Sequence, residues 1–505
     1  MRREDAAVAT SDELFLGIDI GTASTKGSLV NGSGELLASA ERQHRVSMPH
    51  PGWVEHDVDS TWWGESLSIL RELSAIGGKR IRAVGASGIG PCVAIADGQG
   101  RPLRPAILYG VDTRAVGEIG ELTKRFGEEE ILARCGSRLT TQSTGPKIYW
   151  LARNEPDTYA KAKMVFMASS YLTWRLTGSY VLDHHSASQS TPLYDRNTQS
   201  WAEDWAGEVA SGLRLPRLVW PSEVVGSLTE EAAAETGLEM GTAVVAGTID
   251  AWAESVSVGA SAPGPTMLMY GSTMFIVAAE SRPLSHHNLW GAVGVWPGTW
   301  SLAGGMATSG SLTGWFRDLL GDADFGELLE AAKGVPAGSR GLLVLPYFAG
   351  ERTPLFDPDA RGVMAGLTLR HGRAEIYRAL LEATAMGVRH NLEVMSEAGA
   401  DLSHLVAVGG GTKGSLWPEI VSSVCSRPQI IRRYSIGASY GDAFLSAVGV
   451  GAVGPEEQWN PAVDVIEPIA AQAEVYDPLY RNYLDLYRAT SSQAHFLAEL
   501  ERSSG

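Results

Sequence analysis

The hydrophobic pattern of the chain alternates between short apolar runs and segments with helical spacing. Residues 14–19 have the pattern of a buried strand, and two further strands are expected around residues 28–30 and 36–39. Helical spacing follows over residues 60–73, where Ser60 is the expected N-cap. Strands that alternate with helices in this way predict an α/β protein.

The second half of the chain repeats the opening arrangement. Strands are expected at residues 266–270 and 274–278, on either side of Gly271-Ser272-Thr273. The first two strands likewise flank a glycine and several hydroxyl residues. We interpret the repeat as a duplication. It predicts two related α/β domains, residues 13–252 and 253–490, that each present one glycine–hydroxyl hairpin to a shared cleft.

Length and composition agree with this division. The chain has 505 residues, and at roughly 100–200 residues per domain this length predicts two or three domains. Its content of 44% hydrophobic and 20% charged residues is typical of a globular protein. Glycine is in excess, with 58 residues where the usual share is about 7%. The chain therefore needs many tight turns or close backbone contacts.

Charge and cysteine content exclude several classes of function. The formal charge is −17 and the sequence has no run of Lys and Arg, so we expect no nucleic-acid partner. Because no uninterrupted apolar run reaches about 18 residues, we expect no membrane partner either. Three widely spaced cysteines support neither a disulfide framework nor a zinc site, which favours a cytoplasmic protein. Residues 1–12 are polar, contain no secretory signal, and are expected to fray.

The turn after the first strand has the composition of a phosphate-binding loop. Gly21 allows successive backbone N–H groups to point into one concavity, where they can bind oxyanions. Asp19, at the end of the strand, is a candidate for holding a metal ion that neutralises the phosphates. Further donors are Thr22, Ser24, Thr25 and Lys26. The alternative interpretation is an ordinary hairpin turn with a solvated lysine.

Two more glycine loops occur in the second half of the chain. Gly271, Ser272 and Thr273 repeat the composition of the first loop. The other loop follows an expected strand over residues 405–408 and leads into a helix, and its glycines would let a flat ring or a ribose approach the backbone. It consists of Gly409, Gly410, Gly411 and Thr412. Each loop alone is a weak indication, but three in this order predict a nucleotide held between two lobes.

Asp250 ends a short apolar strand just before the second domain begins. A carboxylate in this position can take a proton from a substrate hydroxyl while a metal-bound phosphate approaches in line. This interpretation makes Asp250 a catalytic base that also contacts the substrate and the metal. The alternative is a structural role as the N-cap of a helix over residues 251–257.

A different class of enzyme is suggested by residues 437–441, which match the G-x-S-x-G nucleophile elbow with Ser439 as the nucleophile. Asp464 or Asp477 and then His495 follow in the order found in α/β-hydrolases. A serine hydrolase is therefore an alternative function. It leaves the three glycine loops unexplained, and we prefer the interpretation that these small residues allow a helix to pack closely.

Two longer motifs are more specific. The segment Thr144–Asn154, and the segments Gly362–Leu367 and Glu375–Glu382 taken together, resemble the two signatures of the FGGY carbohydrate kinases. The resemblance extends from about Leu14 to Gly451. It implies a fold of two actin-like, ribonuclease-H-like domains, with ATP and Mg²⁺ in the cleft between them, and a sugar as the small-molecule partner.

The resemblance also assigns a role to the candidate residues. The loop Asp19–Lys26 matches the first phosphate motif of the family, Gly271–Thr273 the second, and Gly409–Gly411 the adenosine motif. Asp250 matches the catalytic base, and Asp19 the carboxylate on the Mg²⁺ side. A homodimer is common in this family and is therefore expected here.

The sequence determines the sugar that accepts the phosphoryl group less closely than it determines the family. The sequence is most similar to the xylulokinase members of the family, which predicts a ketopentose such as xylulose. However, their Gln-Met-His-Gly sugar loop is replaced by Ile89-Gly90-Pro91-Cys92, and the Asn after their catalytic Asp is Ala251. Because a site built to bond one hydroxyl rejects analogues that lack it, a different set of hydroxyls is expected to be recognised.

Several alternatives to a ketopentose therefore stay open. They are ribulose, erythritol or another polyol, gluconate and fuculose, and a catalytically inactive sugar sensor is a further alternative. The residues expected to contact the substrate are Gly88, Ile89, Gly90, Pro91, Asp112, Arg114 and Asp250.

Overall fold

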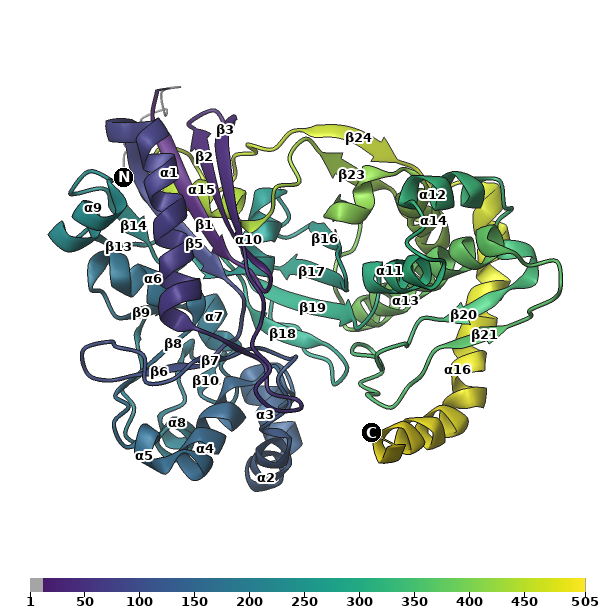
Figure 1. The fold of residues 1–505 in the computed structure, drawn as a ribbon, viewed down its shortest axis with the longest axis horizontal. Helices are drawn as coiled ribbons and strands as arrows, with labels where there is room; N and C mark the ends of the chain where they lie inside the picture. Colours follow the sequence, from purple (N-terminus) through teal and green to yellow (C-terminus); the bar gives the residue numbers. More distant parts are fainter. Residues whose placement is uncertain (1–11, 505) are drawn as a thin grey trace.

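The computed structural model describes residues 12–504, which form two lobes, each built around a mixed β-sheet (Figure 1). Residues 1–12 were predicted to fray and to contain no secretory signal. Of these, residues 1–11 lie outside the described part of the chain.

The first half of the chain forms the first lobe. Its strands are β1 (Leu14–Ile20), β2 (Ser24–Asn31), β3 (Leu36–Gln43), β4 (Glu55–His56), β5 (Ile81–Gly88), β6 (Ala94–Ala96), β7 (Ala106–Ile107), β8 (Met164–Phe166), β9 (Val181–Asp183), β10 (Tyr194–Asp195), β11 (Ser200–Trp201), β12 (Arg217–Val219), β13 (Val224–Ser227), β14 (Ala243–Val245) and β15 (Thr248–Ile249). Its helices are α1 (Ser66–Gly77), α2 (Val116–Phe126), α3 (Glu128–Cys135), α4 (Thr144–Asn154), α5 (Pro156–Tyr159), α6 (Ala168–Thr177), α7 (His184–Ser188), α8 (Glu203–Val209), α9 (Glu230–Thr236) and α10 (Asp250–Ser257).

The second half contributes most of the second lobe. Its strands are β16 (Pro265–Tyr270), β17 (Met274–Glu280), β18 (Trp290–Val293), β19 (Trp300–Met306), β20 (Leu343–Leu345), β21 (Val363–Ala365), β22 (His404–Val408), β23 (Gln429–Arg432) and β24 (Ala462–Ile466). Its helices are α11 (Gly310–Leu319), α12 (Phe325–Lys333), α13 (Arg373–Glu397), α14 (Leu416–Cys425), α15 (Ala438–Gly449) and α16 (Ala470–Ser504).

The two sheets repeat one arrangement of strands. In the first sheet, β1 pairs antiparallel with β2 and parallel with β5, while β2 continues antiparallel to β3 and β5 continues parallel to β14. In the second sheet, β16, β17, β19, β22 and β23 take the places of β1, β2, β3, β5 and β14, with the same pairing directions. The predicted fold of two related α/β domains is therefore confirmed, and each glycine–hydroxyl turn joins the first two strands of its sheet.

The apolar core of each lobe lies between its sheet and the helices that cover it. In the first lobe, Leu16 and Ile18 of β1 belong to one buried cluster with Leu70 of α1 and Leu172 of α6. In the second lobe, the long helix α13 contributes much of the corresponding cluster. Burial of these apolar faces is the main stabilising term, and it holds the strand ends that carry the functional residues.

The predicted N-cap of the first helix is wrong. Helical structure begins at Val58, as a π-helical segment over Val58–Glu65 that continues into α1. Asp57 is the N-cap, because its backbone is extended and its carboxylate accepts the N–H of Ser60 at 2.7 Å. An aspartate three residues earlier therefore provides the capping oxygen, and Ser60 supplies the N–H that is capped.

Two helices from different halves of the chain cross between the lobes. Helix α15 packs against β1, β2 and β5 of the first sheet, and against α10 (Figure 1). The contact is close, since a Cβ atom on Gly441 would lie 1.9 Å from the carbonyl oxygen of Ala253. Helix α15 therefore packs on the sheet of the first lobe, although its residues lie within the second domain predicted from the sequence. The division at residue 252 itself stays a prediction.

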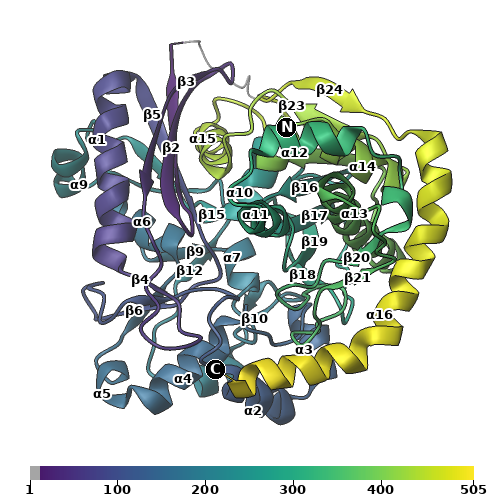
Figure 2. The ribbon, with the colours of Figure 1, turned by 45° about the vertical axis from the view of Figure 1, so that its right-hand side comes forward.

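Helix α16 runs along the outer edge of the second lobe (Figure 2). It is the longest helix of the described chain, but neither it nor any other helix within residues 12–504 combines the length and apolar character needed to span a membrane.

Candidate active site

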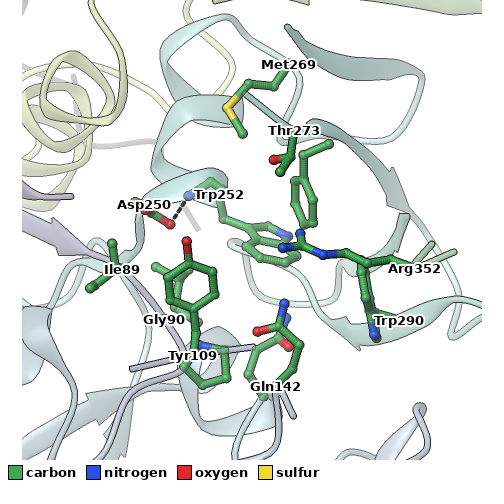
Figure 3. Close-up of a pocket in the computed structure, with 15 residues that line it drawn as sticks. Ile89, Gly90, Tyr109, Gln142, Asp250, Trp252, Met269, Thr273, Trp290 and Arg352 are labelled. Carbon is green, nitrogen blue, oxygen red and sulfur yellow. Dashed lines mark hydrogen bonds between the residues drawn. The ribbon is translucent and has the colours of Figure 1, made fainter. Parts of the chain in front are cut away.

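A cavity of about 130 Å³ lies between the two lobes (Figure 3). The first lobe lines it with Ile89, Gly90, Pro91 and Tyr109, and the second lobe with Thr273 and several other side chains. Asp250 and the two residues after it complete the wall. The cavity therefore joins residues from both halves of the chain, at the place where a shared cleft was predicted.

Asp250 is the first residue of α10 and directly follows β15. Its Oδ1 atom accepts the N–H of Ala251 at 2.7 Å, while Oδ2 has no hydrogen-bond partner among the described residues. The N-cap position belongs to Ile249, so Asp250 is not the capping residue that the alternative interpretation required. One carboxylate oxygen is thus free to face a ligand in the cavity.

Burial raises the pKa of Asp250 above its ordinary value, and the negative charge of Asp19 raises it further. Burial also raises the pKa of Asp19, although Lys26, its neighbour across the hairpin, opposes this effect. Desolvation and the charge of Asp19 raise the pKa of Glu254 to about 7. Several carboxyl groups therefore share one poorly solvated region in which they repel one another.

This group of carboxylates suits a hard cation such as Mg²⁺, because oxygen ligands and negative charge are what Mg²⁺ binds. No set of three or more His, Cys, Asp or Glu residues in the described chain is arranged to enclose a metal ion. Mg²⁺ usually keeps several waters and is completed by phosphate oxygens rather than by a full protein cage. Asp19 and Asp250 therefore fit a metal ion that is shared with a nucleotide.

The first glycine turn is held by a backbone hydrogen bond and by the side chain of His56. The N–H of Gly21 donates to the carbonyl oxygen of Ser24 at 2.9 Å, and His56 Nε2 donates to the carbonyl oxygen of Thr22 at 3.2 Å. Gly21 does not adopt a left-handed φ. Glycine is needed because a Cβ atom there would lie 2.8 Å from the Ser24 carbonyl oxygen.

The hydroxyl groups of the first turn have different surroundings. The hydroxyls of Thr22 and Tyr109 lie 3.1 Å apart, so the turn is linked directly to the cavity wall. Thr25 is fully buried and donates to Glu65 at 2.8 Å, so its hydroxyl is committed inside the lobe and is not a phosphate ligand. Ser24 and Lys26 remain partly exposed on β2 and stay candidates.

The second glycine turn is fixed by the start of α11. The Gly271 N–H donates to the carbonyl oxygen of Thr273 at 3.1 Å, and the Ser272 carbonyl accepts the N–H groups of Ser309 and Ser311, both at 3.0 Å. Thr273 lines the cavity. Like Gly21, Gly271 has no left-handed φ. The turns differ in hydrogen bonding, because the Gly21 N–H donates to the carbonyl three residues later and the Gly271 N–H to the carbonyl two residues later.

The third glycine loop begins with a left-handed residue. Gly409 has φ +98°, and a Cβ atom on it would lie 2.6 Å from the Tyr270 carbonyl oxygen. Gly411 is pressed against Tyr270 and Trp417, whereas Gly410 has nothing within 4 Å of its Cβ position. The Thr412 hydroxyl donates to the Gly409 carbonyl oxygen at 2.8 Å, which closes the turn. One side of this loop is therefore open to a ligand.

The predicted sugar contacts divide into two groups. Ile89, Gly90 and Pro91 line the cavity, but Gly88 is buried against Ala168 and does not. Asp112 and Arg114, expected to bind sugar hydroxyls, are absent from the cavity wall.

The structure gives Asp112 and Arg114 a different role. They pair with each other at 2.7 Å in a fully buried contact, and Arg114 also pairs with Glu55 at 2.8 Å. Asp112 accepts the Val54 N–H at 2.7 Å, and the guanidinium of Arg114 lies over the Trp53 ring. The pair therefore braces the loop beside the cavity, and we no longer expect it to touch the sugar.

Several residues of the cavity wall were not predicted from the sequence. Tyr109 is three residues before Asp112, and Trp252 is two residues beyond Asp250, so both lie close in sequence to predicted site residues. No sequence pattern singled out the remaining side chains, which converge only in the folded chain. They are Gln142, Gln189, Met269, Phe275, Trp290 and Arg352.

The serine hydrolase alternative is wrong. Ser439 is buried in α15, with its hydroxyl 2.8 Å from that of Ser28. His495 instead pairs with Asp357 at 2.8 Å, and Asp477 pairs with Arg389 at 2.6 Å. No triad is assembled, and the small residues of this segment serve the close helix packing described above.

Comparison with known proteins agrees with this fold. The chain matches the N-terminal domain of the FGGY family of carbohydrate kinases over residues 14–257 and the C-terminal domain of that family over residues 266–450. The protein therefore belongs to the FGGY family of carbohydrate kinases.

Among its relatives are xylulose kinases. The xylulose kinase of Escherichia coli (strain K12) is 29% identical, covering 94% of this chain and 99% of its own. That of Bacillus subtilis (strain 168) is 27% identical, covering 94% and 97%. The crystal structure of xylulose kinase from Rhodospirillum rubrum is 32% identical, with a TM-score of 0.88, and covers 96% of this chain and 100% of its own. The expected family resemblance is confirmed.

Proposed function

We propose that this protein transfers the γ-phosphoryl group of ATP to a hydroxyl group of a sugar or sugar derivative, with Asp250 as the general base. The proposal rests on Asp250, which lines the cavity between the lobes and keeps one carboxylate oxygen without a partner. Membership of the carbohydrate kinase family supplies the reaction class.

In the proposed reaction, Asp250 accepts the proton of the reacting hydroxyl as its oxygen attacks the γ-phosphorus. The Gly21 and Gly271 turns hold the phosphate oxygens with backbone N–H groups and hydroxyls, including those of Thr22, Ser272 and Thr273. The open side of the Gly409–Gly411 loop accommodates the adenosine. Closure of the lobes excludes water from the cavity.

Asp19 and Asp250 would hold a magnesium ion, which neutralises phosphate charge when it is bound. The mutual repulsion of these carboxyl groups supports this assignment, since a cation relieves it. It also explains how a chain with a formal charge of −17 can bind a polyanion, through local donors and a cation rather than through its overall field.

The names of the relatives make a ketopentose such as xylulose the first acceptor to test. However, Ile89, Gly90 and Pro91 of the cavity wall have no polar side chain, whereas the sugar loop of the xylulokinases contains Gln and His. The other acceptors named above are therefore alternatives. An inactive sensor is disfavoured, because Asp19, Asp250 and the three glycine loops are all present.

We propose two further properties, a cellular setting and an oligomeric state. The three cysteines, at positions 92, 135 and 425, are unpaired, which favours a reducing, cytoplasmic setting. A homodimer remains a prediction from the family.

A coupled assay of ADP release tests the proposed function. We expect ADP to form only when ATP, Mg²⁺ and a suitable acceptor are all present, and EDTA to abolish its formation. The panel should contain ketopentoses, polyols, aldonates and deoxy sugars. Absence of ADP release with every acceptor would favour the sensor instead.

A further inference from the structure

Two histidines contact the first glycine turn, one directly after β3 and one at the end of β4. His44 Nε2 lies 3.2 Å from the carbonyl oxygen of Gly21, and His56 Nε2 lies 3.2 Å from that of Thr22. The backbone N–H of His44 also donates to the carbonyl oxygen of Ala23 at 3.0 Å. The three carbonyl groups between β1 and β2 are therefore all held by these two residues, whose rings are 4.8 Å apart.

The hydrogen bonds of His56 fix its tautomer. Its Nδ1 accepts the indole N–H of Trp62 at 3.3 Å, so the proton of the neutral ring lies on Nε2 and is donated to the Thr22 carbonyl oxygen. Both side chains are buried, and burial, together with the charge of His44, lowers the pKa of His56 to about 4. His56 is therefore a neutral donor with a fixed orientation.

Both ring nitrogens of His44 face acceptors. Its Nδ1 lies 2.8 Å from Glu65 Oε2, which also accepts the hydroxyl proton of Thr25, and its Nε2 faces the Gly21 carbonyl oxygen. Because a carbonyl oxygen and an ionised carboxylate can only accept, both nitrogens of His44 carry a proton. The His44 side chain is only 7% exposed, so a positive charge paired with Glu65 lies directly against the turn.

A held carbonyl group also fixes the N–H group of the next residue. The Gly21–Thr22 and Thr22–Ala23 peptide bonds are trans, and in a trans peptide the C=O and N–H bonds point in opposite directions. The N–H groups of Thr22 and Ala23 therefore point away from the two histidines. Neither donates a hydrogen bond within residues 12–504, and Ala23 is exposed. Successive free N–H groups of this kind form a concavity that binds anions.

The second glycine turn has the same arrangement with different donors. The carbonyl oxygen of Gly271 accepts the N–H of Gly310 at 2.9 Å, and that of Ser272 accepts N–H groups from the start of α11. The N–H groups of Ser272 and Thr273 have no acceptor in the described part of the chain. In both turns the first two carbonyl groups are held and the next two N–H groups are free. The second turn achieves this with backbone donors, whereas the first requires two side chains.

We propose that His44 and His56 are positioning residues of the first phosphate-binding turn, which hold its carbonyl groups so that the N–H groups of Thr22 and Ala23 face a phosphate of ATP. The inference rests on the proposed function and adds to it two residues that do not line the cavity. His44 has a second effect, because a cation bonded to the Gly21 carbonyl oxygen polarises that peptide and makes the Thr22 N–H a stronger donor. Neither histidine gains or loses a proton in the reaction.

Asparagine and glutamine separate the two sides of each imidazole ring. The amide nitrogen of glutamine can take the place of Nε2 and donate to the turn, whereas the shorter asparagine reaches only the place of Nδ1. His56→Asn therefore keeps an acceptor for Trp62, and His44→Asn keeps a donor to Glu65, but neither supports the turn. The two variants at each position thus differ in the contact under test.

Titration calorimetry with Mg²⁺ and without acceptor compares adenylyl imidodiphosphate, a non-hydrolysable analogue of ATP, with adenosine. In His44→Asn and His56→Asn we expect affinity for the analogue to fall by about tenfold or more and affinity for adenosine to stay unchanged, because only the phosphates contact the turn. His44→Gln and His56→Gln should keep most of the wild-type ratio of the two affinities. In the coupled assay the asparagine variants should raise KM for ATP and leave KM for the acceptor unchanged.

His371 provides the matched control. Its Nδ1 accepts the Thr368 N–H at 2.9 Å and its Nε2 lies 3.3 Å from the Arg340 carbonyl oxygen, so it bonds as His56 does but in a loop of the second lobe. His371→Asn and His371→Gln should both leave the affinity ratio unchanged. Thermal melts check the folding of each variant, and a ratio measured on one preparation does not depend on the fraction that is folded. If one asparagine variant does not fold, the pair at the other histidine decides.

The outcomes separate this inference from the proposed function. A wild-type affinity ratio in an asparagine variant would overturn the inference, and so would an equal loss in the glutamine variant, since the donor to the turn would then not matter. A wild-type protein that binds the analogue no more tightly than adenosine would overturn it as well. Failure of every acceptor to release ADP would instead overturn the proposed function, while the affinity ratio would still decide the role of the histidines.

Discussion

At the scale of single residues, Asp250 in the cavity wall belongs to a group of buried carboxyl groups with little compensating charge. The charge of Asp19 raises the pKa of both Asp250 and Glu254, while Lys26 lowers the pKa of Asp19 and of Glu254. Hydrogen bonds from Ser87 to Asp19 and from the Ala251 N–H to Asp250 also lower the pKa of the group that accepts them. Asp442, on α15, is also close enough for Asp19 and Asp250 to raise its pKa. An arrangement of this kind costs stability in the folded protein and is typical of functional sites. Its neutralisation by a cation and by proton transfer is part of the proposed reaction.

Glu351, the residue before Arg352, gives a prediction about pH that does not involve the catalytic groups. Its side chain is buried and accepts the N–H groups of Ala307 and Arg352, both at 2.7 Å, and burial raises its pKa to about 8. The folded state therefore holds a proton that the unfolded state releases above about pH 4.3, so this contribution to stability is lost as the pH rises toward 8.

Glu351→Gln should remove this dependence, because glutamine keeps the accepting oxygen and does not ionise. We expect the free energy of unfolding of the wild-type protein to fall relative to that of Glu351→Gln as the pH is raised from 5 to 9. Urea denaturation of both proteins at several pH values measures the difference. A difference that is independent of pH would show that Glu351 is ionised in the folded protein throughout.

At the scale of secondary structure elements, the crossing of α10 and α15 is one of the closest contacts between the two halves of the chain. Gly441 allows it, because a Cβ atom there would lie 1.9 Å from the Ala253 carbonyl oxygen in α10. Since α10 begins with Asp250, any separation of the two helices also shifts the candidate base.

Gly441→Ala should therefore destabilise the protein by about 1–3 kcal/mol, the usual cost of overpacking a tight contact. Gly120→Ala is the matched control, because Gly120 lies in the exposed part of α2 with nothing within 4 Å of its Cβ position. There alanine should stabilise by about 0.5–1 kcal/mol through its higher helix propensity. Denaturant unfolding of the two variants measures both effects, and equal effects in the two would refute the packing account.

The elements and the glycine turns could be predicted from the sequence because their causes are local. The apolar run at residues 14–19 and the paired strands around Gly271 appear as β1, β16 and β17. The roles that failed depend on contacts made by distant residues. Thr25 was expected to face phosphate but is committed to Glu65, and the Asp112–Arg114 pair was expected in the cavity but is buried against Glu55 and Trp53.

Arg352 is a cavity residue that could not be predicted from the sequence. It lies on an irregular segment between β20 and β21, and nothing in its neighbouring residues distinguishes it from a surface arginine. Only the folded chain brings it to the wall shared with Asp250. The sequence could therefore predict the glycine loops, whereas this part of the cavity wall required the structure.

At the scale of the whole molecule, two copies of one strand arrangement face a common cavity. Each copy contributes one glycine–hydroxyl turn, and the chain passes from the first copy to the second through α10, the helix that begins with Asp250. This arrangement places the candidate base where the two lobes meet, so movement of one lobe relative to the other can open the cavity to substrates and close it around them.

The central claim is that Asp250 is the base of an ATP-dependent sugar kinase, and the kinetics of Asp250→Asn test it most directly. Asparagine keeps the size of the side chain and can keep its bond to the Ala251 N–H, but it cannot accept a proton. With the best acceptor of the panel, kcat should fall by on the order of 10² or more while the affinity for ATP stays nearly intact. Turnover by Asp250→Asn at the wild-type rate would contradict the claim.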